Sequence, residues 1–401
     1  RIFGLAGFRR FWLGFTFSAV GDVISRVALT WFVFELTQSP EALGLLSLAY
    51  TGPVLIGGFV AGELLDRFDK RNVLIADSII RGLAVGAVPL LHVLGLLELW
   101  HLYVVAAMYG SLMMISLAGS PALVPDLVDA DQLVTANSLE TLSFTLSGVI
   151  GPMIAGVLLT HLSAPALLVL DALSYFFFAL MLLQIRPARK QPAHLAAVSQ
   201  ASYRLSDAVR LLLREPVLLS TTLMFMLFNL GFGAVMVALP ILTDQIGGGA
   251  DGYGILLAAL AVGEVLGALA AGTISLPFTI GLRIGLAQAL AGIALVGIVI
   301  SQSPLVLLVS LFLAGWFSAP LTIWAQTLRM QVIPASLRGR TFAVLRTLMQ
   351  GTMPAGGMLA GFLLPALGTA GLLGGCALVM GAPGLFGMSL ASLRQADEIR
   401  D

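Results

Sequence analysis

Long apolar stretches follow one another along almost the whole chain, and they constrain the fold more than any other feature. A helix needs about 20 apolar residues to cross the hydrocarbon core of a bilayer. Strands of a membrane barrel would instead alternate apolar and polar residues over segments of about ten. Only 10% of the residues are charged, whereas a soluble domain carries about 25%. The sequence therefore predicts an all-α integral membrane protein and excludes a water-soluble fold.

Loop signals divide these stretches into twelve expected membrane-spanning helices, six on each side of a polar interval. We expect an N-terminal six-helix bundle over residues 1–185, a cytoplasmic linker with a short amphipathic helix over 186–216, and a C-terminal six-helix bundle over 217–401. The expected spans are Phe11–Leu36, Ala42–Leu65, Val73–Leu94, His101–Ala118, Leu133–Thr160, Ala166–Ile185, Val217–Leu239, Tyr253–Ile274, Thr279–Ile300, Pro304–Ala325, Thr341–Leu364 and Ala370–Leu390.

Among the loops between the expected spans, only alternate ones carry lysine or arginine, and the two ends of the chain carry them as well. By the positive-inside rule, the loops that carry them face the cytoplasm. The sequence thus predicts a multi-pass protein of the cell (inner) membrane with both termini in the cytoplasm. The loops without lysine or arginine are Thr37–Glu41, Gly95–Trp100, His161–Pro165, Thr243–Gly252, Ser301–Ser303 and Pro365–Thr369.

Several function classes are disfavoured by the composition. The 21 basic and 21 acidic side chains balance, so nucleic acid is not an expected partner. One cysteine, Cys376, and four scattered histidines do not provide the ligand spacing of a metal site. The sequence also contains no Walker loop, dinucleotide fingerprint or nucleophile elbow. We therefore expect no metal, no cofactor and no enzymatic activity.

The two halves of the chain show internal similarity. Gly44–Gly62 aligns without gaps on Gly254–Gly272, and three glycines of one segment fall on three glycines of the other. Ala155–Leu159 near the end of span five likewise matches Ala360–Leu364 in span eleven. A repeated six-helix unit is typical of transporters, whose substrate site lies between the repeats near the middle of the membrane.

The joint between spans two and three carries the strongest local motif, which runs from Gly62 to Arg71. A glycine lets one helix approach another closely, and Asp66 at a helix end can face the positive N-terminus of a neighbouring helix. We expect this loop to form a cytoplasmic gate, with Asp66 docked at the start of span eleven. The expected gate residues are Gly62, Asp66, Arg67, Lys70, Arg71, Glu140, Arg340 and Arg346.

This loop resembles the signature loop of the major facilitator superfamily, which has Gly, three residues, Asp-Arg, and then a Gly and two basic residues. Asp69 stands where the second Gly would be. Other motifs are similar to the drug:proton antiporter subfamily that holds macrolide efflux pumps and the enterobactin exporter. They are Phe11-Trp12, Gly21-Asp22, Glu35–Ser39, Asp77 with Arg81, Pro125–Val128, Ala136–Leu139, Gly151-Pro152, Asp171–Tyr175 and Gly339-Arg340. The resemblance implies the major facilitator fold, alternating access, and most often proton-driven export of lipophilic compounds.

A glycine- and proline-rich motif lies in span five and contains Gly148, Gly151, Pro152 and Gly156. It resembles the Gly-Pro-x-x-Gly-Gly motif of antiporters in the same superfamily, with Ala155 at the first of the paired glycines. Small residues also serve ordinary helix packing in membranes. The motif is therefore open to either interpretation.

Ionisable residues near the middle of a span are costly and usually face a cavity or a partner. Asp22 in span one is the leading candidate for proton coupling, and Glu264 in span eight is the second candidate. Arg26 lies one helical turn after Asp22, so the alternative is a permanent structural ion pair between the two.

Three further ionisable residues receive structural interpretations. Asp77 and Arg81 are one turn apart in span three, and we expect them to satisfy each other and to brace helix packing. We expect Asp171 to brace the outer end of span six.

Polar and aromatic residues near the middle of other spans are candidates for lining a substrate cavity. Asn229, Gln288 and Gln350 could each offer a hydrogen bond to a substrate or bond a neighbouring helix, and both alternatives stay open. Trp316 could line an adaptable apolar pocket, or pack against other helices and lipid. Arg26 completes the expected cavity residues.

The sequence as a whole predicts a secondary active transporter that exports lipophilic small molecules, in exchange for protons. Its expected partners are the substrate, protons and the lipid bilayer, and we expect a monomer. The alternatives are a transporter of (lyso)phospholipids or siderophores with the same fold, and a membrane sensor that binds substrate without transporting it.

Overall fold

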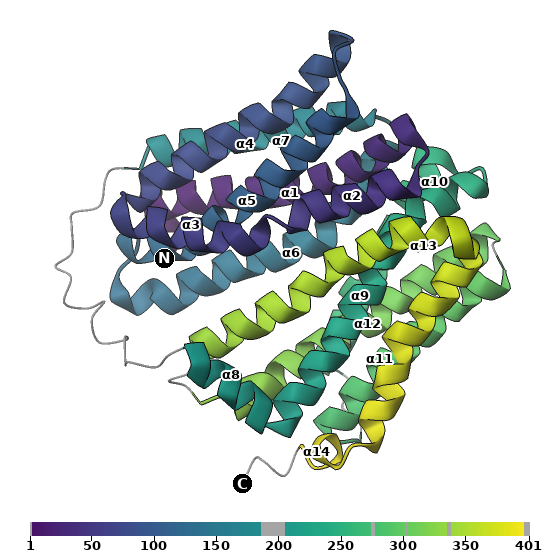
Figure 1. Ribbon diagram of the computed structural model, residues 1–401. Coiled ribbons are helices and arrows are strands. Elements are labelled where there is room, and N and C mark those ends of the chain that lie inside the picture. The colour runs from purple at the N-terminus through teal and green to yellow at the C-terminus, as the bar shows by residue number, and fades with distance from the viewer. Residues whose placement is uncertain (1, 186–204, 274–276, 302, 335–337, 397–401) are drawn as a thin grey trace. The chain divides into compact units, whose positions relative to one another are not determined.

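The structure is a computed structural model that describes residues 2–185, 205–273, 277–301, 303–334 and 338–396. Every regular element in these residues is a helix (Figure 1). The chain divides into two compact units, Arg1–Gln191 and Pro192–Asp401. Residues 186–204, which make up much of the expected linker, lie outside the described residues.

The first unit forms six spans. One of them is broken into α2 (Pro40–Thr51) and α3 (Val54–Arg67) at Gly52 and Pro53, because proline lacks the backbone N–H that would continue the helix. Short 3-10 turns occupy Ile2–Gly4, Val124–Asp126 and Ala130–Gln132. The unbroken spans are α1 (Ala6–Thr37), α4 (Lys70–Val93), α5 (Leu99–Leu123), α6 (Leu133–Leu159) and α7 (Ala164–Leu183).

The second unit also forms six spans, because α13 (Arg338–Ser389) contains two of them. Its direction reverses near Gly368, whose φ of 67° and ψ of 171° are not helical (Figure 1). Glycine adopts a positive φ without the steric cost that other residues meet. The remaining helices are α8 (Leu205–Arg214), α9 (Pro216–Gln245), α10 (Gly249–Thr273), α11 (Ile280–Ile300), α12 (Pro304–Val332) and α14 (Ala391–Arg394).

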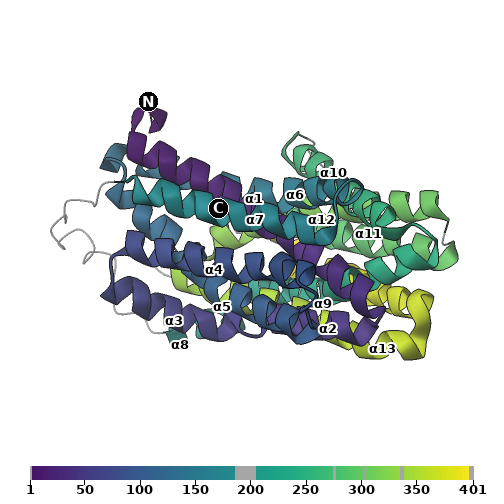
Figure 2. The same cartoon turned by 90° about the horizontal axis from the view of Figure 1, so that it is seen from above.

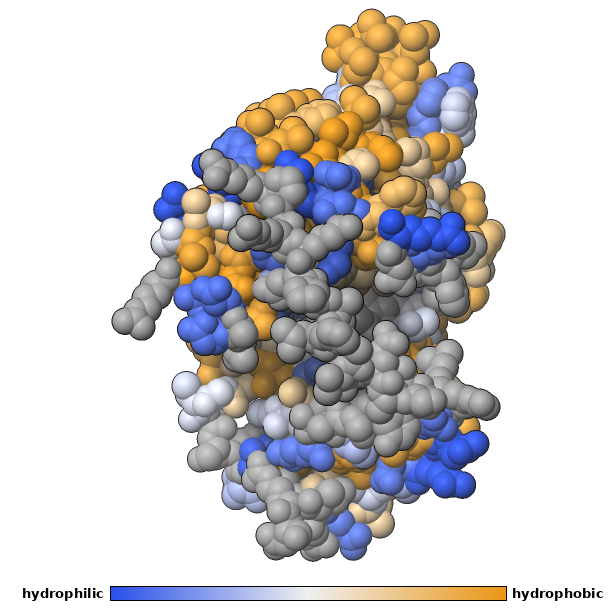
Figure 3. Space-filling model, turned by 90° about the vertical axis from the view of Figure 1, so that its left-hand side faces the viewer, coloured by the Kyte–Doolittle hydropathy of each residue, from blue (hydrophilic) through white to orange (hydrophobic). Residues whose placement is uncertain are grey.

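The structure confirms the prediction of twelve spans. Ten helices of the described residues are each long and apolar enough to cross a membrane. The broken span of α2 and α3 and the second arm of α13 bring the total to twelve. In the view of Figure 3, patches of apolar residues alternate with hydrophilic residues. Large apolar side chains such as Leu83, Val93, Ile300 and Leu378 remain exposed. Such a surface suits contact with lipid rather than with water.

The internal repeat reappears in the packing of each unit. A Cβ atom on Gly57 would overlap the backbone of α5, and a Cβ atom on Gly267, the residue that the repeat aligns with Gly57, would overlap the backbone of α12. The contact also works in reverse, because Gly110 of α5 lies against Tyr50 and Gly315 of α12 lies against Leu260. In each unit, the second and fourth spans therefore pack through an equivalent pair of glycines, Gly57 with Gly110 and Gly267 with Gly315.

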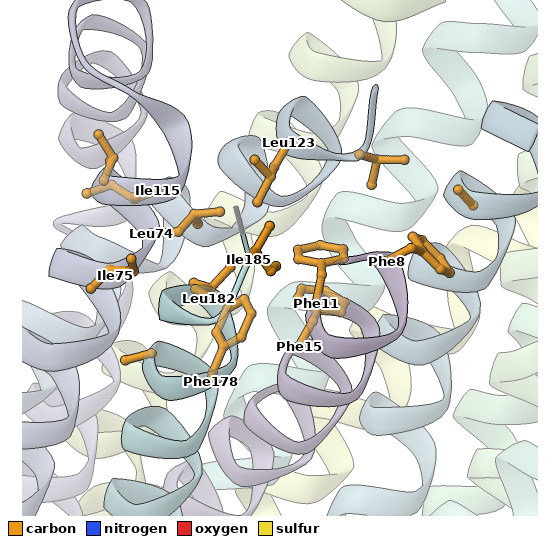
Figure 4. Close-up of a cluster of buried hydrophobic side chains, with 14 of the residues drawn as sticks. Phe8, Phe11, Phe15, Leu74, Ile75, Ile115, Leu123, Phe178, Leu182 and Ile185 are labelled. Atoms are coloured by element: carbon orange, nitrogen blue, oxygen red, sulfur yellow. The ribbon is translucent and has the colours of Figure 1, made fainter. Parts of the chain in front are cut away.

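Aromatic packing fixes α1 against α7 in the first unit (Figure 4). The rings of Phe11 and Phe178 have centroids 6.1 Å apart, and Phe15 lies 6.3 Å from Phe178. A Cβ atom on Gly14 would come within 2.7 Å of the Phe178 ring, so the glycine permits this approach. α4 packs on α7 as well, which places α1, α7 and α4 side by side (Figure 2).

Candidate functional site

A network of charged side chains joins α1, α4 and α7 inside the first unit. Arg81 of α4 is 1% exposed. Its guanidinium lies 2.6 Å from the carboxylate of Asp77 on the same helix and 3.5 Å from that of Asp22 on α1. Arg81 also donates a hydrogen bond of 3.0 Å to the hydroxyl of Tyr175 on α7, and this hydroxyl donates to Asp22. We call these four residues the Arg81 network.

Two aromatic rings enclose the guanidinium of the Arg81 network. Its central carbon lies 4.5 Å from the ring centroid of Tyr175 and 5.8 Å from that of Tyr109 on α5. A cation over an aromatic face is attracted by the ring, more strongly where water is absent. The two rings thus shield the Arg81 guanidinium from water while it forms ion pairs with the carboxylates of Asp22 and Asp77.

Asp22 lies at the wetter edge of the network, with its side chain 24% exposed. The alternative of a structural pair between Asp22 and Arg26 is wrong in this structure, because Arg26 is exposed and the ion partner of Asp22 is Arg81. Asp77 and Arg81 do pair as expected, but Arg81 reaches beyond its own helix. Spacing along one helix could not reveal that reach, because it depends on how α1 and α7 pack on α4.

A small cavity lies beside the network within the same unit. Arg26, an expected cavity residue, lines it together with Ser25, Tyr50, Tyr109 and apolar side chains that include Leu168. The rings of Tyr50 and Tyr109 are 5.0 Å apart. The cavity therefore combines an apolar wall with hydroxyl groups and one cation.

Buried amides take the place of charges in the second unit. Gln288 of α11 is fully buried and donates to the carbonyl oxygens of Met224 on α9 and Met380 on α13, at 3.0 and 3.1 Å. Asn229 of α9 donates to the carbonyl oxygen of Met349 on α13 at 2.8 Å. Of the two alternatives for these amides, the structure shows hydrogen bonds between helices.

Glu264 and Trp316 lie where α10 and α12 pack together. Glu264 is half-buried, and among the described residues it forms no ion pair. The Trp316 ring lies 6.0 Å from that of Phe312 on its own helix, and a Cβ atom on Gly267 would overlap the Trp316 backbone. The side chain of Gln350 lies outside the part of the chain that the structure describes.

Basic residues of the signature loop bind the C-terminal ends of neighbouring helices. Lys70 donates to the carbonyl oxygen of Ala122 in α5 at 2.9 Å. Arg71 donates to those of Leu182 and Leu183 in α7 at 2.7 and 2.9 Å. Carbonyl groups in the last turn of a helix are not fully used by the helix itself, and cations are favoured at the negative end of the helix dipole. The loop therefore ties together the helix ends on this side of its own unit.

Asp69 replaces a glycine of the superfamily loop, and the structure gives this replacement a role. Its side chain accepts a hydrogen bond of 3.0 Å from the backbone N–H of Asn72, which makes it the N-cap of α4. Aspartate is among the most favourable N-cap residues. The departure from the superfamily pattern thus stabilises the start of the third span.

Gly62 makes no close helix contact among the described residues. A Cβ atom there would meet no described atom within 4 Å, and the close approach of this span occurs at Gly57 instead. Arg67 forms an exposed ion pair of 2.7 Å with Glu63 on its own helix, and Glu140 on α6 is half-buried. The side chains of the other expected gate residues lie outside the described part, so the gate stays a prediction; these are Asp66, Arg340 and Arg346.

In the antiporter-like motif of α6, one glycine packs closely against a neighbouring helix and another has no close neighbour. A Cβ atom on Gly151 would lie 2.6 Å from Cβ of Val23 on α1, whereas one on Gly148 would meet nothing within 4 Å. Pro152 lies inside the helix, and Gly156 is buried. Close packing on α1 therefore accounts for Gly151, next to the helix segment that carries Asp22.

Two functional candidates were not evident from the sequence. Tyr175 appears there only as part of a motif, although its spacing of one turn from Asp171 could have suggested a polar partner inside the span. Arg329 follows the expected span Pro304–Ala325, and no motif singles it out. Arg329 of α12 is 2% exposed, donates to the carbonyl oxygen of Thr221 at 3.0 Å, and lies 4.5 Å from the ring centroid of Phe225.

Solved structures with the same fold are transporters. A bacterial homologue of the lysosomal transporter Spinster covers 98% of this chain, and the chain covers 96% of it, with a TM-score of 0.67 at 14% identity. The nucleoside transporter NupG aligns over 98% of this chain and 99% of its own, with a TM-score of 0.71 at 12% identity. A bacterial homologue of the iron transporter ferroportin gives a TM-score of 0.69 at 15% identity over 96% and 99% of the two chains. At these identities the likeness establishes the fold alone.

Sequence comparison then defines the family. The model of the transmembrane secretion effector family matches residues 3–400, and the chain belongs to this family of major facilitator transporters. It is 27% identical to the uncharacterized transporter YfiS of Bacillus subtilis, over 95% of this chain and 93% of that protein. It is 28% identical to the enterobactin exporter EntS of Escherichia coli over 83% and 79% of the chains. The staphyloferrin A transporter of Staphylococcus aureus is 24% identical over 85% of each.

Proposed function

We propose that this chain is a secondary active transporter that exports lipophilic small molecules in exchange for protons. The observation that carries the proposal is the position of Asp22. Its carboxylate is partly exposed on one side and bonded to Arg81 and Tyr175 on the other. A carboxylate at such a boundary can bind a proton from water, and the loss of its negative charge then alters its interactions with the buried Arg81 and Tyr175.

The physical effect of protonation at Asp22 supports this coupling. An ionised Asp22 shares the positive charge of Arg81 with Asp77. Protonation removes one negative charge, so the attraction between α1 and α4 weakens. A transporter that alternates between two conformations needs a ligand with different affinity for each, and a proton at Asp22 meets that requirement.

Siderophore export is the second candidate function. It is favoured by the two relatives whose names state siderophore transport, EntS and the staphyloferrin A transporter. The cavity lined by Arg26, Tyr50 and Tyr109 could suit an anionic aromatic group, because it offers a cation beside aromatic rings. We retain it as an alternative substrate class for the same transport mechanism.

Transport by purified protein in proteoliposomes tests the function. The probes are a labelled macrolide, labelled iron-free enterobactin and a fluorescent lysophospholipid, each with an imposed pH gradient. We expect uphill movement of one lipophilic probe, together with proton movement in the opposite direction. A protonophore should abolish the accumulation. Uphill movement of enterobactin or of the lysophospholipid would select that substrate class, and binding without flux of any probe would support a sensor instead.

We also propose that both termini face the cytoplasm, because the loops on the other side carry no lysine or arginine. A single cysteine at Ser301, in a Cys376→Ser background, should react with an impermeant reagent only from outside the cell. Cys376 is buried, so its replacement removes background labelling. Labelling of the Ser301→Cys variant only from the cytoplasm would contradict the proposed topology.

A further inference from the structure

Asp171 of α7 is a buried carboxyl group with no cation bonded to it. It is 0% exposed. Its Oδ1 accepts a hydrogen bond of 3.1 Å from the hydroxyl of Ser174 on the same helix. Its Oδ2 has no hydrogen-bond partner, and Asp171 forms no ion pair in the part of the chain that the structure describes.

The backbone of α1 closes the space beside this carboxyl group. A Cβ atom on Gly21 would overlap Oδ1 of Asp171 and would come within 2.5 Å of the Ser174 hydroxyl. Glycine at position 21 is therefore what allows α1 to lie directly against Asp171. The same contact excludes water from that side of the carboxyl group.

The charges around Asp171 do not favour its ionised form. The charged groups that act on it are Asp22 of α1 and Arg81 of α4, and the other titratable neighbours are Tyr109 of α5 and Tyr175 of its own helix. Arg81 is already bonded to Asp77 at 2.6 Å and to Asp22 at 3.5 Å. Asp22 is itself an acid, and its negative charge opposes a second one nearby.

We propose that Asp171 holds a proton in this conformation and is the second proton-binding residue of the transporter. An ionised carboxylate without a partner in a site of low dielectric constant is so costly that the group is neutralised instead. Two carboxyl groups that share one site also do not both ionise. The inference rests on the proposed proton coupling for its role in transport, but the bound proton itself is a separate, measurable property.

A route for this proton leads through the cavity of the first unit. Ser25 follows Gly21 by one turn of α1, and Leu168 precedes Asp171 by one turn of α7, and both line the cavity. The buried hydroxyl of Ser25 faces Asp171, and the buried hydroxyl of Tyr109 faces that of Tyr50. A hydroxyl group can accept and donate at once, so these two, with a water molecule between them, can relay a proton between Asp171 and the exposed side near Arg26.

Infrared spectroscopy of the purified protein tests the proposal directly. A protonated carboxyl group has a C=O stretch separate from that of a carboxylate. We expect the Asp171→Asn variant to lose one such band, and the matched variant Asp244→Asn to keep it, because Asp244 lies exposed near the end of α9. An Asp171→Asn spectrum with no lost carboxyl band would overturn the proposal.

A second variant keeps the test informative if Asp171→Asn does not fold. Ser174→Ala removes the hydrogen bond to Oδ1, so it should shift the same band without abolishing it. If all carboxyl C=O bands of Ser174→Ala kept their native positions, the assignment of the band to Asp171 would be contradicted. If the band is present but native protein fails to pump any probe, the proposed function fails and the bound proton stands. If pumping is proton-driven and the band is absent, only the role of Asp171 fails.

Discussion

The two units tie their spans together at corresponding places, but with different chemistry. In the first unit, Arg81 of the third span bonds Asp22 in the first span and Tyr175 in the sixth. In the second unit, Gln288 of the third span bonds backbone carbonyls in the first and sixth spans of that unit. One bridge is a guanidinium with charged partners, and the other is a neutral amide.

The same contrast between charge and amide is found beside a packing contact that both units share. Gly151 of α6 packs against Val23, and the corresponding Gly356 of α13 packs against Leu230. Asp22 precedes the first contact residue, and Asn229 precedes the second. An acid in one unit therefore corresponds to an amide in the other.

This difference indicates where protons can act. Amides do not change charge near neutral pH, so the bridges of Gln288 and Asn229 are permanent. The bridges of Asp22 instead join charged groups of α1 and α4. We therefore propose that the first unit couples protons and the second unit serves as a scaffold. Among the described residues, the half-buried Glu264 is the acid near the middle of a second-unit span that would contradict this.

The largest expected effect is on stability, from removal of the two bridges. Arg81→Gln leaves Asp77 buried without its cation, which should cost about 3–5 kcal/mol. Gln288→Leu removes two hydrogen bonds to carbonyl groups that keep their helical donors, and it should cost less, about 1–2 kcal/mol. Thermal unfolding of the purified variants measures both. Equal losses would show that the two bridges are equivalent and would break the comparison.

A smaller effect should be symmetric between the units. Gly110→Ala and Gly315→Ala each push a methyl group against a backbone carbonyl of the neighbouring span, and overpacking typically costs about 1–3 kcal/mol. The matched controls are Gly62→Ala and Gly272→Ala, where a Cβ atom meets nothing within 4 Å. These controls should be neutral or slightly stabilising. A large loss in only one unit would contradict the packing equivalence.

The smallest expected effect compares the caps of the third spans. Asp69 caps α4 through a bond of 3.0 Å to Asn72, and Thr279, its counterpart in the repeat, caps α11 through a longer bond of 3.4 Å to Leu282. Asp69→Ala should cost about 1 kcal/mol, and Thr279→Ala less, about 0.5 kcal/mol. Unfolding temperatures of the two variants check the order. A greater loss for Thr279→Ala would mean that the charge of Asp69 adds nothing to its cap.

Periodicity and composition were sufficient to predict the fold, because span length and loop charge are local properties. The repeat alignment even placed Gly57 on Gly267, which make the same contact. The site was harder to predict, since the partner of Asp22 is Arg81 from another helix rather than Arg26 from its own. The same holds for Asp171, whose isolation depends on Gly21 of α1. Contacts between spans follow from three-dimensional packing, which spacing along one helix does not specify.

Uphill transport by Asp22→Asn tests the central claim most directly, namely that the Arg81 network of the first unit couples protons to transport. The measurement compares accumulation against a gradient with exchange down a gradient in the same proteoliposomes, with Asp244→Asn and Glu264→Gln as matched controls. We expect Asp22→Asn to exchange substrate but to lose pH-driven accumulation, while both controls still accumulate. Unchanged uphill pumping by Asp22→Asn, together with its loss in Glu264→Gln, would contradict the account and place coupling in the second unit.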